Sequence, residues 1–563
     1  MIKIENLSVA FDGPEVVKNV TLELKDGEIL GVVGESGSGK SVTALTLMGL
    51  VADTAEITSG RIVFDGVVLR EAGKPIDKAL YRKYQGAEMS MVFQEPMTSL
   101  NPTVRVGRQV EEMLRLHTDF SKEKIREKVL ETFEAVGLRD VETVYASYPH
   151  QLSGGMRQRV MIAMAVILHP DLVVCDEPTT ALDVTIQNQI IELLRTINTK
   201  EQNSMLFITH DLNLARRICH RIAVMKDGRV VELGKTEDIF EHPEETYTRE
   251  LIEAVPSRLK RRTSVFQGKY PAEGEERHSG QEETCPAKGE KRCPGRIGES
   301  LETEEAVGGV EGQAFPPVVE VRDLSVFYQD GTNSLFSRKK RHAAVQGADF
   351  SIYRGESLGL VGESGCGKTT LSRAILGMNR DITGEIRHTT VRPQMIFQDP
   401  YSSLNPAKTI GWLLQEPLRA AAALDKSRAM SREDMEAAAY DMLRRVGMEE
   451  AYFHRRPSQL SGGQRQRVSI GQALITNPGL VVADEPVSAL DVTIQAQIME
   501  LMQKLQQEMQ LSYLFISHDI NVVYKMCDRI MVMKDGEIIE IGETQELFDN
   551  PKQEYTKKLL ASH

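Results

Sequence analysis

The sequence is poor in cysteine and has no long apolar run. Its 563 residues include six cysteines, which are scattered along the chain. The N-terminus, MIKIENLSVAF, alternates like a strand and lacks the basic, apolar and small-residue order of an export signal. These features predict reduced thiols rather than a disulfide framework, and a protein that stays in the cytoplasm. No apolar run approaches the roughly 18 residues of a membrane-spanning helix, so we expect no span in this chain.

Basic residues are also in deficit. The chain has 68 Lys and Arg against 81 Asp and Glu, a net charge of -13. Phosphate backbones demand clustered Lys and Arg, so this balance argues against nucleic acid as the main partner. The hydrophobic fraction of 41% with 26% charged residues is ordinary for a globular protein. A single core usually stops growing near about 250–300 residues, and the length therefore predicts two domains.

The chain repeats itself. LSGGMRQRV at 152–160 returns as LSGGQRQRV at 460–468, and VVCDEPTTALDVTIQ at 173–187 returns as VVADEPVSALDVTIQ at 481–495. The matching pairs Ser153 and Ser461, Asp176 and Asp484, His210 and His518, and Tyr247 and Tyr555 are each 308 residues apart. Such constant spacing indicates duplication of a whole domain. We expect domains at 1–256 and 317–563, joined by a flexible linker at 257–316 that is rich in Glu, Gly, Pro and Lys.

Each half contains an apolar strand, a glycine loop and a helical pattern, in that order. The loops are GESGSGKS at 34–41 and GESGCGKT at 362–369. Glycines let backbone N–H groups turn inward around phosphate oxygens, the lysine reaches the terminal phosphates, and the last hydroxyl is offered to magnesium. A simple strand-to-helix turn is the alternative, but two copies in the same context argue against it. The predicted nucleotide-binding residues are Gly34, Ser36, Gly37, Ser38, Gly39, Lys40, Ser41 and Val42, with Gly362, Ser364, Gly365, Cys366, Gly367, Lys368, Thr369 and Thr370.

A second apolar strand in each half delivers two acids. LVVC leads into Asp176 and Glu177, and LVVA leads into Asp484 and Glu485. The first acid of each pair is predicted to hold magnesium, and the second to polarise the attacking water. Adjacent strand residues point to opposite faces, so this division requires the chain to leave the strand at the glutamate. The alternative, an acidic surface turn, is disfavoured by the phosphate loop in the same half.

The LSGGMRQR and LSGGQRQR segments resemble the signature sequence of ATP-binding-cassette (ABC) proteins, and the resemblance covers both halves outside the linker. A helix cap alone would not explain the glycine pairs that follow Ser153 and Ser461, namely Gly154 and Gly155, and Gly462 and Gly463. The resemblance implies an α/β fold of tandem P-loop NTPase domains, each with a RecA-like core, an antiparallel β subdomain and a helical subdomain. It implies ATP and Mg²⁺ as cofactors, and hydrolysis in both halves. It also implies that the halves pair within the chain, so that Lys40 faces Ser461 and Lys368 faces Ser153.

The remaining family residues follow from the same resemblance. Gln94 and Gln398 resemble the glutamine that senses nucleotide and contacts a transmembrane partner. His210 and His518 resemble the histidine at the γ-phosphate, and Asp183 and Asp491 the inter-lobe aspartate. Phe11 and Tyr328 are predicted to stack on adenine, with core packing as the alternative. The metal ligands implied are Ser41, Gln94 and Asp176 in one half, and Thr369, Gln398 and Asp484 in the other.

Three features resemble one branch of the family, the oligopeptide, dipeptide and nickel importer ATPases. They are EPMTSLNP and DPYSSLNP after the glutamines, the RQR ending of each signature, and the tails at 242–256 and 551–562. The branch implies a peripheral protein at the cytoplasmic face of the cell membrane, with two permease subunits and, through them, an extracytoplasmic solute-binding protein. An ordinary amphipathic helix is the alternative for the tails. A tandem-cassette ATPase of translation or DNA repair is the alternative function.

Three further segments are ambiguous. Cys285 and Cys293 lie in the linker, and two thiols are too few for a four-thiolate iron–sulfur cluster. The basic run SRKKRH at 337–342 is read as a solvated loop. The interval from Lys368 to Gln398 is 24 residues shorter than the interval from Lys40 to Gln94. Lys368 follows Lys40 by 328 residues, whereas Gln398 follows Gln94 by only 304. We expect that part of the antiparallel β subdomain is missing there, and that the two sites differ in ATP affinity.

Overall fold

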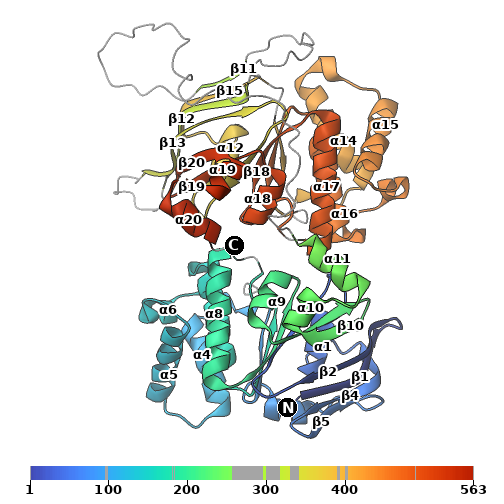
Figure 1. The fold of residues 1–563 in the computed structure, drawn as a ribbon, viewed down its shortest axis with the longest axis vertical. Helices are drawn as coiled ribbons and strands as arrows, with labels where there is room; N and C mark the ends of the chain where they lie inside the picture. The colour runs from blue at the N-terminus through green and yellow to red at the C-terminus, as the bar shows by residue number, and fades with distance from the viewer. Residues whose placement is uncertain are drawn as a thin grey trace. The chain divides into compact units, whose positions relative to one another are not determined.

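The chain forms two compact units that separate near residue 255 (Figure 1). In the computed structural model each unit is an α/β domain and is described by itself. The structure describes residues 2–94, 99–180, 182, 184–255, 296–299, 317–329, 341–389, 393–399, 403–488 and 490–561. Among these residues, no helix has both the length and the apolar character needed to cross a bilayer.

The first unit is built on two sheets. Its strands are β1 (Ile2–Phe11), β2 (Glu15–Leu24), β3 (Ile29–Val33), β4 (Ala55–Phe64), β5 (Val67–Glu71), β6 (Met89–Val92), β7 (Leu172–Asp176), β8 (Ser204–Thr209), β9 (Arg221–Lys226) and β10 (Arg229–Lys235). An antiparallel sheet has the order β2-β1-β4-β5, and a larger sheet has the order β10-β9-β3-β8-β7-β6. The larger sheet is parallel except for its β9–β10 edge. Strands β3, β7 and β8 are buried at every residue, which explains their unbroken apolar sequences.

Helices cover the larger sheet and form a separate cluster. They are α1 (Lys40–Leu47), α2 (Lys78–Tyr84), α4 (Val106–His117), α5 (Lys122–Ala135), α6 (Val141–Ala146), α7 (Gly154–Val166), α8 (Val184–Glu201), α9 (Leu212–Ile218), α10 (Thr236–Glu241) and α11 (Thr246–Ala254), with the short 3-10 turn η1 (Pro149–Gln151). Helices α4, α5 and α6 lie together, away from the antiparallel sheet of β1, β2, β4 and β5 (Figure 1). This is the predicted helical subdomain, and α7 links it to the core through shared buried apolar residues.

The second unit repeats this plan. Its strands are β11 (Arg296–Glu299), β12 (Pro317–Gln329), β13 (Arg341–Tyr353), β14 (Ser357–Val361), β15 (Ile382–His388), β16 (Gln394–Ile396), β17 (Leu480–Asp484), β18 (Ser512–Ile516), β19 (Arg529–Lys534) and β20 (Glu537–Glu543). The sheets have the orders β11-β15-β12-β13 and β16-β17-β18-β14-β19-β20. Strand for strand, the second order matches the larger sheet of the first unit. The predicted fold class is confirmed.

The helices of the second unit follow the same order along the chain. They are α12 (Lys368–Ile375), α14 (Ile410–Leu424), α15 (Arg432–Arg445), α16 (Gly462–Leu474), α17 (Val492–Met509), α18 (Ile520–Met526), α19 (Thr544–Asp549) and α20 (Glu554–Ala561). Three 3-10 turns, η2 (Lys426–Arg428), η3 (Glu450–His454) and η4 (Pro457–Gln459), lie among them. Helices α14, α15 and α16 share one buried cluster with the core strands β17 and β18.

The two units differ in their antiparallel sheets. In the first, β5 and α2 lie between β4 and β6, whereas β15 and β16 are separated by the short stretch 389–393. In the part of the chain that the structure describes, the predicted shortening therefore coincides with the absence of a strand and a helix between β15 and β16. Strand β11 pairs in parallel with β15, at the edge where β5 pairs with β4 in the first unit. Strand β11 lies at 296–299, within the segment 257–316 that the sequence predicts to be a flexible linker, and the extent of that linker stays a prediction.

Candidate nucleotide site

Each phosphate loop begins with a glycine that no other residue can replace. Gly34 follows β3 with φ +150°, and a Cβ there would lie 2.2 Å from the backbone oxygen of Met225. Gly362 follows β14 with φ +156°, and its Cβ would lie 2.3 Å from the oxygen of Met533. Because a Cβ needs more than 3.0 Å, the absence of a side chain lets each loop pass over the neighbouring strand. The loop then turns back into α1 or α12 at the lysine.

The loop lysines are buried and held by backbone carbonyl groups. Lys40 Nζ donates to the oxygens of Gly34 and Glu35, both at 2.7 Å. Lys368 Nζ donates to the oxygens of Gly362 at 2.7 Å and Glu363 at 2.8 Å. Burial lowers the pKa of Lys40, and the nearby Glu177 carboxylate opposes this change. A buried ammonium group beside a glycine loop at a helix N-terminus fits a polyphosphate ligand.

A hydroxyl and a carboxylate meet beside each loop. Ser41 Oγ, in the first turn of α1, donates a 3.0 Å hydrogen bond to Asp176 Oδ1 at the end of β7. Thr369, in the first turn of α12, and Asp484, at the end of β17, occupy the corresponding positions in the second half. Burial raises the pKa of both aspartates, although the hydroxyl groups partly offset this effect. A hard cation such as Mg²⁺ prefers oxygen ligands of this kind, so the pairs fit the predicted metal sites.

The second acid leaves the strand, as the predicted division of labour requires. Glu177 has φ +47° and Glu485 has φ +48°, whereas the aspartate before each is the last residue of its strand. Glu177 Oε1 lies 3.1 Å from His210 Nδ1, and Glu177 Oε2 accepts hydrogen bonds from Gln94 Nε2 and Thr180 Oγ1, both at 2.9 Å. One glutamate thus gathers the predicted histidine and glutamine around it.

The second half repeats this arrangement with one change. Glu485 Oε2 lies 3.3 Å from His518 Nδ1 and accepts a 2.6 Å hydrogen bond from Gln398 Nε2. Ser488, the counterpart of Thr180, donates to the backbone oxygen of Glu485 at 3.1 Å. In both halves the glutamine amide nitrogen is directed at the glutamate. The role of Gln94 and Gln398 as metal ligands stays a prediction.

The charges of each pair favour an ionised glutamate and a protonated histidine. Burial opposes ionisation of Glu177, but the hydrogen bond and charge of His210 outweigh it and lower its pKa to about 2. Burial likewise acts to lower the pKa of His210, yet the contact with Glu177 raises it. The pKa of Glu485 is lowered and that of His518 raised, against burial and through the same contact. An ionised carboxylate is the form that can accept a proton from water.

The signature serines cap helices. Ser153 Oγ accepts from the Met156 N–H at the start of α7, and Ser461 Oγ accepts from the Gln464 N–H at the start of α16, both at 3.3 Å. The glycines after them have a packing role that the sequence did not reveal. A Cβ on Gly155 would lie 2.7 Å from Ile186 Cγ2 of α8, and one on Gly463 would lie 2.6 Å from Ile494 Cγ2 of α17.

The two aromatic candidates differ in exposure. Phe11, at the end of β1, is partly buried and packs against the core of its antiparallel sheet. Tyr328, near the end of β12, is 44% exposed, and its hydroxyl accepts a 3.2 Å hydrogen bond from Asn379 Nδ2. Hydrogen bonding with Thr370, another predicted nucleotide-binding residue, and with Asn379 lowers the pKa of the Tyr328 hydroxyl. Stacking on adenine stays a prediction for both.

Some predicted features lie outside the described residues. They are Asp183, the linker cysteines Cys285 and Cys293, and residues 337–340 of the basic run. The other four cysteines are buried free thiols: Cys175, Cys219, Cys366 and Cys527. Cys366 lies in the second phosphate loop, where the first loop has Ser38, and its Sγ is 3.9 Å from Lys368 Nζ.

Sequence reasoning missed two residues that touch the phosphate loops. The hydroxyl of Tyr247 accepts a 3.4 Å hydrogen bond from the Glu35 N–H, and that of Tyr555 accepts a 3.2 Å hydrogen bond from the Glu363 N–H. Both tyrosines lie in the tail helices α11 and α20. Their 308-residue spacing showed that they correspond, but not that they fold back onto the loops.

Comparison with known proteins agrees with this geometry. Residues 17–180 and 345–488 match the family described as ABC transporter, and residues 231–295 and 539–563 match the C-terminal region of oligopeptide/dipeptide transporters. The glutathione import ATP-binding protein GsiA of Escherichia coli O157:H7 is 40% identical over 587 residues, covering 100% of this chain and 89% of the relative. Its counterpart in Pectobacterium atrosepticum is 39% identical over 588 residues, with the same coverage. A solved post-hydrolysis dimer of an ATP-binding cassette with ADP and Pi is 30% identical, covering 42% of this chain and 99% of its own, with a TM-score of 0.38.

The chain therefore belongs to the ABC transporter family of ATP-binding proteins. Within that family it is an importer ATPase of the oligopeptide/dipeptide type, with two cassettes in one chain. It uses ATP with Mg²⁺, as predicted. The alternative of an ATPase acting in translation or DNA repair is set aside, because both tails match the transporter region.

Proposed function

We propose that this chain powers the import of short peptides and related small solutes, with glutathione-like tripeptides as the leading class. The observation that carries the proposal is the match of both tails to the oligopeptide/dipeptide region. Relatives that are aligned along this whole chain are named glutathione import proteins. Nickel, the other solute expected from the family branch, has no support from these relatives.

We further propose that the chain acts at the cytoplasmic face of the membrane as a peripheral subunit. An importer ATPase has to deliver its conformational change to a membrane-embedded part. The proposed partners are two permease subunits and, through them, an extracytoplasmic solute-binding protein. No nucleic acid is involved, which agrees with the net charge of -13.

Each half supplies the same set of roles. ATP provides the phosphoanhydride bond whose hydrolysis releases free energy, and Mg²⁺ neutralises charge on its phosphates. In the first half Lys40 binds the phosphates, Ser41 and Asp176 hold the metal, and Glu177 orients the attacking water. Its counterparts are Lys368, Thr369, Asp484 and Glu485. The glutamine and histidine on each glutamate keep that carboxylate in place.

We also propose that the two sites are composite. Ser461 with its glycine pair closes over the nucleotide at Lys40, and Ser153 with its glycine pair closes over the nucleotide at Lys368. Support comes from the capped helix starts, where backbone N–H groups form an anion site. In this arrangement nucleotide binding and closure of the two halves are one event.

Replacing both glutamates tests the proposed chemistry and the transport role together. In membrane vesicles that contain the cognate permease and binding protein, the E177Q/E485Q variant should lose ATP hydrolysis by about a hundredfold or more. ATP-driven uptake of labelled glutathione should be lost with it, while ATP still binds. The loss follows because glutamine keeps the shape of the side chain but cannot accept a proton.

A matched control uses two exposed glutamates on the helices that follow the acidic strands. Glu192 on α8 and Glu500 on α17 occupy corresponding positions and are exposed. The E192Q/E500Q variant should hydrolyse ATP and support uptake like the parent. Hydrolysis by E177Q/E485Q at the parent's rate would show that the assigned roles are wrong. Parent vesicles that hydrolyse ATP but import neither glutathione nor dipeptides would contradict the substrate class.

A further inference from the structure

In both halves a tyrosine from the C-terminal tail reaches the phosphate loop. Tyr247 on α11 accepts from the Glu35 N–H, and Tyr555 on α20 accepts from the Glu363 N–H. The tyrosines lie in residues 231–295 and 539–563, outside the segments that match the ATPase cassette itself. The contact therefore joins the transporter-specific tail to the nucleotide site, twice in one chain.

We propose that Tyr247 and Tyr555 are positioning residues for ATP binding. Each fixes the first turn of its phosphate loop, so the tail is part of the nucleotide site rather than an appendage to it. This inference rests on the ATPase function of the chain and adds two residues to the site.

The same residue of each loop is held through both of its backbone polar groups. The Glu35 oxygen accepts a hydrogen bond from Lys40 Nζ at 2.7 Å, while the Glu35 N–H donates to Tyr247. In the second half, the Glu363 oxygen accepts from Lys368 Nζ at 2.8 Å, and its N–H donates to Tyr555. A tyrosine that fixes this residue also fixes an anchor of the phosphate-binding lysine.

The start of each tail helix is itself held by a glutamate of the preceding strand. Glu232 on β10 accepts hydrogen bonds from two backbone N–H groups just before α11, at 2.9 and 3.2 Å. Glu540 on β20 accepts from the corresponding N–H groups before α20, at 2.8 and 3.1 Å. Carboxylates at a helix N-terminus stabilise it by charge as well as by hydrogen bonding. These hydrogen bonds connect the end of the cassette sheet to the start of the tail helix.

The tyrosine rings have a matching environment. Lys226 Nζ lies 4.3 Å from the ring centroid of Tyr247, and Lys534 Nζ lies 5.3 Å from that of Tyr555, as in cation–π pairs. Burial raises the pKa of each tyrosine to about 12. Each hydroxyl is therefore neutral at physiological pH and accepts the loop N–H without adding charge near the phosphates.

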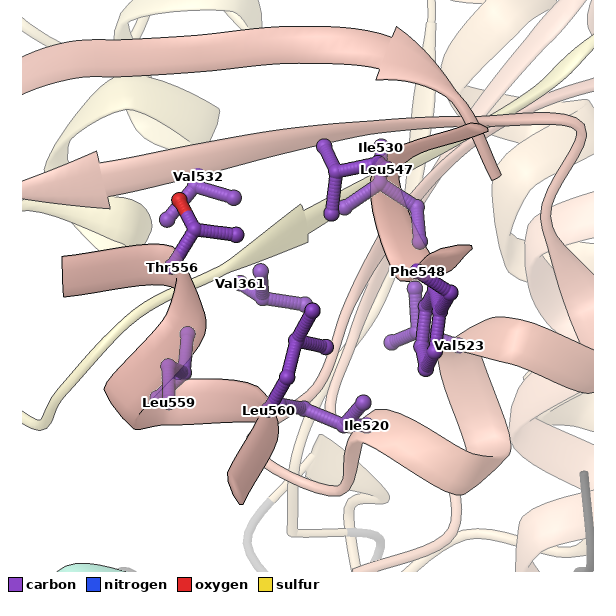
Figure 2. Close-up of a pocket in the computed structure, with 10 residues that line it drawn as sticks. All are labelled: Val361, Ile520, Val523, Ile530, Val532, Leu547, Phe548, Thr556, Leu559 and Leu560. Atoms are coloured by element: carbon purple, nitrogen blue, oxygen red, sulfur yellow. The ribbon is translucent and has the colours of Figure 1, made fainter. Parts of the chain in front are cut away.

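Helix α20 also packs against the strand that leads into the second loop. Figure 2 shows Leu559 and Leu560 of α20 beside Val361, around a small apolar pocket. Val361 is the last residue of β14, and Gly362 begins the loop. A shift of α20 would therefore displace residues at the start of the loop, through Val361, as well as Glu363.

Removing only the two hydroxyl groups tests the proposal. In the full chain, Y247F/Y555F keeps both rings and their packing but leaves the Glu35 and Glu363 N–H groups without this acceptor. We expect the KM for MgATP to rise about two- to tenfold, the range for one lost hydrogen bond, with a smaller change in kcat. Tyr524→Phe is the matched control, because Tyr524 is also buried but its hydroxyl donates a hydrogen bond to Gln545 Oε1 rather than contacting a phosphate loop.

The control variant should lower the melting temperature without changing the KM for ATP. If Y247F/Y555F also lowers the melting temperature while its KM stays at the parent's value, the tyrosines are only structural and the proposal is overturned. Should the double variant fail to fold, Y555F alone provides the test, because Tyr555 is less buried than Tyr247. A parent chain without ATPase activity would instead contradict the proposed function.

Discussion

The glutamate after each acidic strand is contacted by side chains from distant parts of its half. Glu177 accepts from a histidine, a glutamine and a threonine, and Glu485 from a histidine and a glutamine. A catalytic carboxylate held by several neutral and cationic donors stays ionised and keeps its orientation. We infer that these donors keep the base aimed, and that the histidine contributes most of the charge stabilisation.

The histidine–glutamate pairs make stability depend on pH. The pKa of Glu177 falls from 4.5 to about 2, so its contribution is present above about pH 4.5 and is lost as pH falls toward 2. The pKa of His210 is raised above 6.5, so its contribution is complete below that pH and is lost as pH rises through the folded value. The pair is therefore most stabilising between about pH 4.5 and 6.5.

Comparison of the parent with H210Q/H518Q in urea unfolding measures this dependence. The parent's midpoint should exceed that of the variant by more at pH 5.5 than at pH 8.5, because only the protonated histidine forms the ion pair. Glu192→Gln with Glu500→Gln is the control, because these exposed changes remove charge away from the histidine–glutamate pairs. A parent-to-variant difference that is the same at both pH values would contradict the assigned charges.

At this scale the sequence predicted residue types better than contacts. The order of apolar strand, Asp and Glu was enough to assign the two acids different roles, on the condition that the chain leaves the strand at Glu177. It was not enough to predict that Thr180 and Gln94 share one oxygen of that glutamate, because Gln94 is 83 residues away along the chain. The tyrosine contacts were missed for the same reason, since they join residues 212 and 192 positions apart.

Among the elements, the signature helices show that a motif can serve packing and binding together. The first glycine of each pair is open to a methyl group, with Cβ contacts of 3.5 Å for Gly154 and 3.8 Å for Gly462. The second is not, because Ile186 or Ile494 lies against it. Helix α7 can therefore approach α8 closely only where Gly155 stands, and α16 can approach α17 only at Gly463.

Alanine scanning of the two glycines separates these roles. G155A/G463A should lower the free energy of unfolding by about 1–3 kcal/mol at each site, the usual cost of overpacking. G154A/G462A should cost less than about 1 kcal/mol, because its methyl groups meet only ordinary contacts. Urea unfolding of the parent and of both double variants measures these changes in the free energy of unfolding. Equal losses in the two variants would show that the packing contact does not constrain the helix.

The sequence predicted the elements that carry short-range signals. Strand, glycine loop and helix were expected in order in each half, and the loss within the second antiparallel sheet was expected from spacing alone. Strand β11 was not expected, because its four residues lie in a segment dominated by Glu, Gly and Pro. Edge pairing of so short a strand depends on the neighbouring β15, which no local pattern reveals.

Across the whole molecule, the two halves are similar but not equal. Among its described residues the second half has no counterpart of α2 before β16, has β11 at the sheet edge that β5 occupies in the first half, and has Cys366 in place of Ser38. Cys366 lies in the second phosphate loop itself, beside Lys368. We therefore expect the two sites to bind ATP with different affinities.

The most direct test of the account follows ATP binding and the distance between the halves together. The chain would carry E177Q and E485Q, with spin labels at K122C and R432C, two exposed positions on α5 and α15, and with Cys285 and Cys293 replaced by serine. The account predicts two ATP molecules bound per chain in two affinity steps, with the label distance shortening as the second binds. Two bound ATP molecules with an unchanged distance would contradict the composite sites.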